Sequence, residues 1–166
     1  MIGIRVGQGY DVHRLQAGYD LWLGGIKVNH RLGAVGHSDA DVLIHVLCDA
    51  LLGAASLGDI GHHFPDTDLT YKGIDSKELL RKVCALLRDT GYEIGNVDST
   101  ILAQQPKINP HVPAMRMVLA EVMDIEVDQI SIKATTTEKL GFVGREEGIA
   151  AHAVCLLYKV GEKAKS

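Results

Sequence analysis

The residues best suited to metal chemistry gather in one stretch, positions 36–68, which holds four of the chain's eight histidines and six aspartates. Apolar residues recur there at three- and four-residue spacing from Leu43 to Ala54, which predicts an amphipathic helix. His45 lies off that apolar stripe, one helical turn from both Asp41 and Asp49. An imidazole flanked by carboxylates is a candidate metal ligand. A hydrogen-bonded core histidine is the plainer alternative.

Two more candidate ligands, Asp11 and His13, lie in segment 2–13, whose weak apolar alternation predicts a strand. Side chains two positions apart leave a strand from the same face, so these two point the same way. With His45 they would form the nitrogen and oxygen ligand set that zinc accepts, with an open position for a substrate oxygen. The Asp-x-His tripeptide is very common, so taken alone it is better explained by Asp11 capping a turn and His45 being a hydrogen-bonded core histidine.

Three loops carry groups suited to phosphate. His37 and Ser38 precede the predicted helix, where free N–H groups and the helix dipole attract anions. The Gly- and Asp-rich segment 59–68 reads from composition alone as an acidic surface loop. The hydroxyls of residues 135–137 could donate to phosphate, and Glu138 could ligate a hard cation such as Mg²⁺, although β-branched strand residues before a turn have the same pattern. The residues by themselves indicate a metal-dependent protein that handles phosphates.

The elements expected to position these groups alternate irregularly, which favours an α+β fold with a mixed or antiparallel four- to five-stranded sheet and helices on one face. Strands are predicted at 2–13, 21–28, 96–104, 129–137 and 149–160, and helices at 39–54 after a Ser38 cap, 76–90 and 112–123. Residues 29–36, 59–68 and 138–148 are predicted to be loops. A single domain is expected at 1–160, followed by a polar tail at 161–166.

Composition narrows the function classes. The net charge of −4 leaves no basic stripe for nucleic acid, and no apolar run is long enough for a membrane span. Neither a signal peptide nor another targeting segment is recognisable at the N-terminus. Cys48, Cys84 and Cys155 are odd in number and sit in apolar segments, as buried thiols of a reducing compartment do. A bacterial cytoplasm is the expected setting.

Six separated motifs, taken together, resemble the 2-C-methyl-D-erythritol 2,4-cyclodiphosphate synthase family of the non-mevalonate isoprenoid pathway. The motifs are GYDVH, HSDAD followed by DALLGAA, FPDTD, GNVD, AQQPK and KATTTEKLGF. The resemblance runs from Gly7 to about Tyr158 and favours the functional over the plainer interpretation at each motif.

The resemblance implies a metal-dependent phosphorus–oxygen lyase that works as a homotrimer with active sites between subunits. Its substrate would be 4-diphosphocytidyl-2-C-methyl-D-erythritol 2-phosphate. The 2-phosphate would attack the β-phosphorus, close 2-C-methyl-D-erythritol 2,4-cyclodiphosphate and expel CMP. A central cavity of the trimer could bind an isoprenoid diphosphate.

The resemblance also implies roles for individual residues. Zinc or a similar divalent ion would bind Asp11, His13 and His45, and Glu138 would ligate a second cation, Mg²⁺ or Mn²⁺, that bridges the substrate diphosphate. His37 and Thr136 would support the transition state. The methylerythritol phosphate would contact His37, Ser38, Asp59, Ile60, Gly61, Phe64, Pro65, Asp66, Thr67 and Asp68. The cytidine diphosphate would contact Ala103, Gln104, Gln105, Pro106, Lys107, Ile108, Asn109, Thr135, Thr136, Thr137 and Glu138.

Phe142 and Arg145 match the segment that lines the central cavity and its mouth, with Tyr10 and Glu147 in matching segments. Trimer packing and an intersubunit ion pair are an equal alternative for these residues. Two rival functions also remain open. One is a metal-dependent phosphohydrolase, in which water attacks, and the other is a non-catalytic trimer that senses isoprenoid diphosphates.

Overall fold

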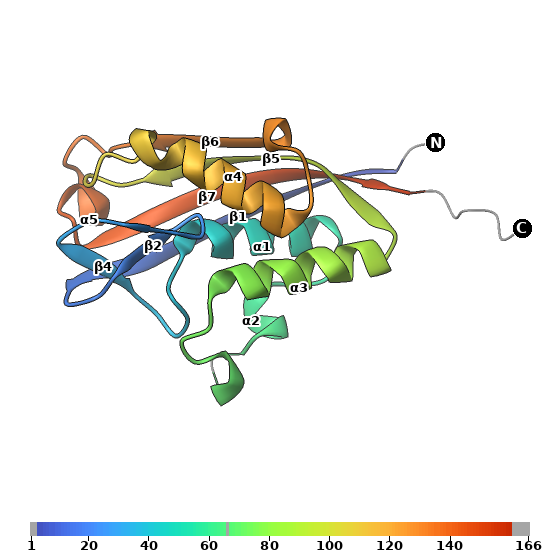
Figure 1. The fold of residues 1–166 in the computed structure, drawn as a ribbon, viewed down its shortest axis with the longest axis horizontal. Helices are drawn as coiled ribbons and strands as arrows, with labels where there is room; N and C mark the ends of the chain where they lie inside the picture. The colour runs from blue at the N-terminus through green and yellow to red at the C-terminus, as the bar shows by residue number, and fades with distance from the viewer. Residues whose placement is uncertain (1–2, 66, 161–166) are drawn as a thin grey trace, which may run out of the picture.

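A computed structural model describes residues 3–65 and 67–160 and shows a mixed five-stranded sheet carrying helices (Figure 1). The sheet order is β4-β1-β7-β5-β6, in which only the β5–β6 pair is parallel. Its strands are β1 (Ile4–Ala17), β4 (Leu32–Val35), β5 (Tyr92–Leu102), β6 (Ile130–Thr135) and β7 (Gly148–Lys159). Two short strands, β2 (Leu21–Leu23) and β3 (Ile26–Val28), form a separate hairpin.

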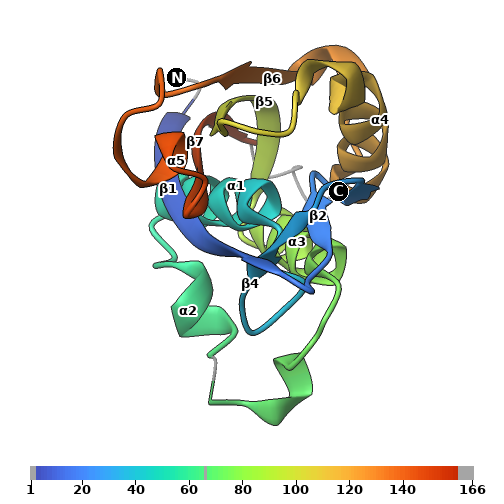
Figure 2. The same cartoon turned by 90° about the vertical axis from the view of Figure 1, so that its left-hand side faces the viewer.

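The longer helices are α1 (Val42–Ala54), α3 (Ser76–Asp89) and α4 (Val112–Met123), and two single-turn helices are α2 (Ile60–His63) and α5 (Gly141–Gly144). Short 3₁₀ helices occur at Leu69–Tyr71, Asn109–His111 and Val127–Gln129. Helix α1 packs on β1 and β7, α3 packs on α1, and α4 packs on α3 and β6, so all three cover one face of the sheet (Figures 1 and 2). The predicted α+β class, with helices on one face, is confirmed.

None of α1, α3 and α4 covers the opposite face of the sheet, where the short helix α5 brings Phe142 against Gly148 at the start of β7 (Figure 2). Apolar side chains on its outer positions are exposed, among them Ile4 (61%) and Val6 (66%) on β1 and Val154 (45%) on β7. None of the described helices is long and apolar enough to cross a membrane. The three cysteines are buried free thiols, as expected.

The contact between α1 and β1 depends on two glycines. A Cβ atom at Gly7 would lie 2.0 Å from the carbonyl oxygen of Ala50, and one at Gly9 would lie 2.4 Å from that of Val46. Any side chain at either position would therefore push the helix backbone away from the strand. The absence of side chains here brings the middle and last turns of α1 close to the first half of β1.

Helix α1 begins at Val42 with Asp41 as its N-cap, so the prediction of a Ser38 cap is wrong. The physical reason lies in the intervening loop, where Ala40 has a positive φ of 58° and turns the chain before the helix starts. Ser38 instead accepts a hydrogen bond from the Ala40 N–H. The fully buried Asp41 carboxylate accepts from Leu43 and Ile44 at distances of 3.1 and 3.0 Å.

Other boundaries also differ from the prediction, since β1 continues to Ala17 and β5 already begins at Tyr92. The segment 21–28 is a hairpin rather than one strand, because Gly24 and Gly25 both have positive φ and form its two-residue turn. Residues 32–35, predicted as loop, pair with the end of β1. The short helices α2 and α5 occupy segments predicted as loops. A local pattern of so few residues carries little periodicity, which explains these misses.

Replacing Asp41 should destabilise the protein more than replacing an ordinary cap. Its carboxylate accepts from four backbone N–H groups, the two in α1 and those of Gly24 and Gly25 in the hairpin turn (2.9 and 2.7 Å). Asp41→Ala is expected to lower the free energy of unfolding by about 3 kcal/mol or more, because a buried unsatisfied donor costs about 1–3 kcal/mol. Urea unfolding at an unchanged m-value measures the loss.

The matched control is Asp75→Ala. Asp75 caps α3 from a more exposed position through one backbone donor, Lys77 N, at 2.9 Å. Its loss should cost about 1 kcal/mol, as for a typical N-cap. Equal losses in the two variants would contradict the role of Asp41 in joining the hairpin to the helix.

Candidate metal centre

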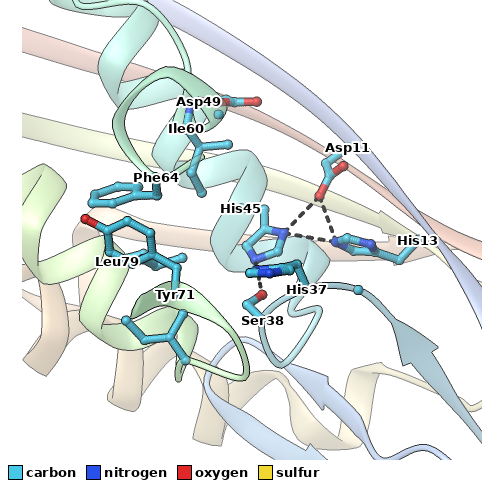
Figure 3. Close-up of a pocket in the computed structure, with 13 residues that line it drawn as sticks. Asp11, His13, His37, Ser38, His45, Asp49, Ile60, Phe64, Tyr71 and Leu79 are labelled. Atoms are coloured by element: carbon cyan, nitrogen blue, oxygen red, sulfur yellow. Dashed lines mark hydrogen bonds and ion pairs between the residues drawn. The ribbon is translucent and has the colours of Figure 1, made fainter. Parts of the chain in front are cut away.

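Asp11, His13 and His45 converge on one point at the bottom of a cavity (Figure 3). Asp11 Oδ2 lies 3.2 Å from His13 Nε2 and 3.3 Å from His45 Nδ1, and the two ring nitrogens lie 2.9 Å apart. The three potential ligand atoms fall within 4.8 Å of one another. Two imidazole nitrogens and one carboxylate oxygen suit zinc or a similar divalent ion, and this set leaves room for a further ligand. The predicted metal ligands are thus brought together.

The alternation of β1 explains why two ligands lie side by side. Gly7, Gly9, Asp11 and His13 occupy every second position of the strand, on the face that packs against α1. His45 is in the first turn of α1, directly before the residue whose carbonyl lies over Gly9. The close helix–strand contact therefore sets the separation of the three side chains.

Electrostatics prepares the cluster for a cation. Burial works to raise the pKa of Asp11, but hydrogen bonds and charge from His13 and His45 outweigh it and hold that pKa well below its usual value. Burial works to lower the pKa of His45, and the hydrogen bond and charge of Asp11 outweigh it and raise that pKa. A divalent ion held by these side chains would compensate the charge of the Asp11 carboxylate.

The cavity above the cluster has a volume of about 380 Å³. Five predicted substrate residues line it: His37, Ser38, Ile60, Gly61 and Phe64. The others of that set do not: Asp59 caps α2 through His62 N, Asp68 caps the turn Leu69–Tyr71, and Pro65 and Thr67 lie outside the lining. Asp66 lies outside the described residues.

Five lining residues are not among the predicted site residues: Gly36, Asp49, Tyr71, Ile74 and Leu79. Asp49 follows His45 by one helical turn, and its carboxylate accepts from Ile60 N at 2.8 Å, which fixes the start of α2. Burial raises the pKa of Asp49, an effect opposed by that backbone hydrogen bond. Tyr71 stacks edge-on against Phe64 with ring centroids 5.4 Å apart. Only Asp49 had a signal in the sequence, its spacing from His45.

A second pocket of about 490 Å³ lies over the ends of β5 and β6. Eight residues of the predicted nucleotide-binding set line it: Ala103, Gln104, Pro106, Lys107, Ile108, Asn109, Thr135 and Thr136. Gln105, Thr137 and Glu138 do not line it. Thr136 Oγ1 donates to a carboxylate oxygen of Glu138 at 3.0 Å, and Glu138 has a positive φ of 52°. This pocket shares no lining residue with the metal cavity.

Phe142 and Arg145 lie in and directly after α5. Phe142 borders a shallow hollow with His13 and Leu15 of β1. Arg145 makes two hydrogen bonds of 3.0 Å to the carboxylate of Glu147. Within this chain the guanidinium is therefore already paired with a carboxylate.

Comparison with known proteins places this geometry in a family. The sequence model of the YgbB family matches residues 4–158. The chain belongs to the YgbB family. It is 66% identical over 153 residues to a Porphyromonas gingivalis protein named 2-C-methyl-D-erythritol 2,4-cyclodiphosphate synthase, covering 92% of this chain and 94% of that one. A Parabacteroides distasonis protein of the same name is 63% identical over 158 residues, covering 95% and 98%.

Solved structures of relatives agree with the fold. The bifunctional IspDF from Campylobacter jejuni superposes with a TM-score of 0.93 at 42% identity, over 96% of this chain and 43% of that one. An IspF–CDP complex from Plasmodium falciparum gives 0.85 at 37% identity, over 96% and 98% of the two chains. The predicted family membership and fold are confirmed.

Removing a ligand should abolish tight zinc binding. We expect His45→Ala to weaken zinc affinity by more than about 100-fold, beyond the loss typical of residues outside the ligand shell. Zinc at about 100 times its Kd should stabilise the unaltered protein by about 2.7 kcal/mol and leave the variant nearly unaffected. Thermal unfolding with and without zinc measures both. The control, His62→Ala, removes an exposed histidine of α2. A loss of affinity there equal to that of His45→Ala would contradict the assignment.

Proposed function

We propose that this chain converts 4-diphosphocytidyl-2-C-methyl-D-erythritol 2-phosphate to 2-C-methyl-D-erythritol 2,4-cyclodiphosphate and CMP. The observation that carries the proposal is the convergence of Asp11, His13 and His45 beneath a cavity lined by His37 and Ser38. Relatives above 60% identity that carry the name of this synthase support it. The chain would then act as a phosphorus–oxygen lyase.

The reaction needs positioning more than a strong base. An oxygen of the 2-phosphate forms a bond to the β-phosphorus, and the bond from that phosphorus to the bridging oxygen breaks. CMP leaves with this oxygen and its electron pair. Because the nucleophile is already an anion, the chain's contribution is to align the two phosphates and neutralise their charge.

The side chains divide these tasks. Asp11, His13 and His45 would hold a zinc ion that, when bound, polarises the phosphoryl group under attack. Glu138 would hold a second cation, Mg²⁺ or Mn²⁺, against the diphosphate. His37 would place its imidazole against the phosphates and Thr136 would donate its hydroxyl, and both would act on charge that develops during the reaction.

A homotrimer would complete the active site. The cavity with the metal ligands and the pocket with the nucleotide-binding residues share no lining residue in one chain, yet one diphosphate has to reach both. The bare, apolar outer face of the sheet suits association with further copies. We therefore propose that the metal cavity of one subunit faces the nucleotide pocket of the next.

Isotope labelling separates cyclisation from hydrolysis. With zinc and Mg²⁺ in ¹⁸O-enriched water, the chain should release CMP and the cyclic diphosphate with no label incorporated. Attack by water would give an open-chain bisphosphate carrying one labelled oxygen, which mass spectrometry resolves. That product would establish the phosphohydrolase instead. Absence of any turnover with both metals at saturation would favour the non-catalytic sensor.

Mixed assemblies test the shared site and the roles of two residues together. His37→Ala and Thr136→Val should each lower kcat by about 100-fold, since each removes a group that acts on developing charge. After unfolding, mixing in equal amounts and refolding, about one quarter of the sites would combine intact residues from two subunits. Turnover should then recover to about one quarter of that of the unaltered protein. Each variant refolded alone is the control, and no recovery would mean that each chain holds a complete site.

A further inference from the structure

On the side that faces away from the other metal ligands, the His45 ring is hydrogen-bonded to two serine hydroxyls. His45 Nε2 lies 3.0 Å from Ser76 Oγ and 3.0 Å from Ser38 Oγ, while Nδ1 faces Asp11 and His13 (Figure 3 shows the Ser38 side). The Ser76 hydroxyl in turn donates to Oδ1 of Asp39. A chain of hydrogen bonds therefore runs from the metal cluster through one serine to a carboxylate.

The carboxylate of Asp39 fixes which groups donate and which accept in these hydrogen bonds. A carboxylate only accepts hydrogen bonds, and Asp39 accepts from the backbone N–H groups of Ser76 (3.0 Å) and Asp41 (3.2 Å) as well as from the hydroxyl. The single hydroxyl proton of Ser76 is thus used toward Asp39. Its oxygen then accepts the proton on His45 Nε2, which leaves Nδ1, on the side of Asp11 and His13, as the ring nitrogen that can bind a metal.

We propose that Ser76 and Asp39 are positioning residues that hold His45 in the tautomer that can bind a metal through Nδ1. The proposal rests on the metal centre assigned above and extends it to a second layer of residues. Partners of this kind fix the ring orientation and raise the basicity of a metal-bound histidine. Ser38 Oγ lies at the same distance from Nε2, but its other partners among the described residues are Ser76 Oγ and the Ala40 N–H, so it does not link His45 directly to a carboxylate.

Burial of Ser76 and a backbone hydrogen bond of Asp39 hold the two residues in place. Ser76 is fully buried (0% exposed) and is the first residue of α3. Asp39 is held from the other side, because its own N–H donates to the carbonyl of Ile74 at 3.1 Å. The first turn of α3 and the loop before α1 are thereby tied to one ring nitrogen of the metal cluster.

Ser76→Ala is the informative substitution, because it removes the hydroxyl and leaves the backbone contact of Ser76 with Asp39 in place. Metal-free protein is titrated with zinc in competition with a chelator. We expect Ser76→Ala to lose about 10–100-fold in zinc affinity. Asp39→Asn should change affinity in the same direction, and the double variant should lose no more than Ser76→Ala, because the two residues act as one unit.

The matched control is Thr90→Ala, which removes the hydroxyl that bonds the carbonyls of Leu86 and Leu87 at the other end of α3. It destabilises the same helix and should leave zinc affinity unchanged. Equal zinc affinities for Ser76→Ala and the unaltered protein would overturn the proposal while the metal centre stands. Failure of the unaltered protein to bind zinc would overturn the metal centre and this second layer with it.

A spectroscopic measurement keeps the test valid if Ser76→Ala folds poorly. In the unaltered, zinc-loaded protein labelled with ¹⁵N-histidine, His45 should show a proton on Nε2 that exchanges slowly with water. Ser76→Thr, which keeps the hydroxyl, should preserve that signal. A proton on Nδ1 and a bare Nε2 in the zinc-loaded protein would overturn the proposal.

Discussion

The close approach of α1 to β1 is the constraint on which the rest of this structure depends. It exists because Gly7 and Gly9 present no side chain where the carbonyls of Ala50 and Val46 lie against the strand. A helix normally stands off a sheet by the length of the side chains between them. Along the two glycines the helix backbone lies much closer to the strand than this. The next two residues on the same face of β1 are Asp11 and His13. The first side chains after the two glycines therefore reach the first turn of α1, which carries His45.

The same contact places the other parts of the cavity. The buried Asp41 cap fixes where α1 begins and ties it to the hairpin turn at Gly24 and Gly25. One turn beyond His45, Asp49 anchors the start of α2, and that helix brings Ile60 and Gly61 to the cavity wall. Each carboxylate in α1 or at its start is thus used to join a different segment to the helix. The metal ligand His45 lies between these two carboxylates on the same helix.

Sequence patterns reveal the parts of this site that follow from local geometry. The period of a strand predicts Asp11 and His13 on one face, as observed. The apolar stripe predicted for α1 is too narrow, because 10 of the 13 helix residues are buried, but the helix does carry His45 as expected. That these two elements touch could be inferred only from family resemblance, because nothing local in the sequence says which strand a helix covers. The cap was misplaced at Ser38 because the turn at Ala40 uses a backbone conformation that an alanine does not signal. Ser76 and Asp39 were missed for a related reason. They meet over 37 residues of sequence, and each looks like an ordinary helix-start residue.

The candidate site is divided between two pockets, and this division gives a reason for the sheet face that no long helix covers. A substrate that carries a nucleotide at one end and a sugar phosphate at the other needs two recognition surfaces joined by a diphosphate. In one chain the metal cavity opens beside α1, and the nucleotide pocket lies over the ends of β5 and β6, with no residue in common. Under the proposed function, assembly through the exposed apolar residues of β1 and β7 supplies the missing proximity. The subunit contact made by burying that face would then also hold the two phosphates in alignment. Subunit association and catalysis would therefore depend on the same surface.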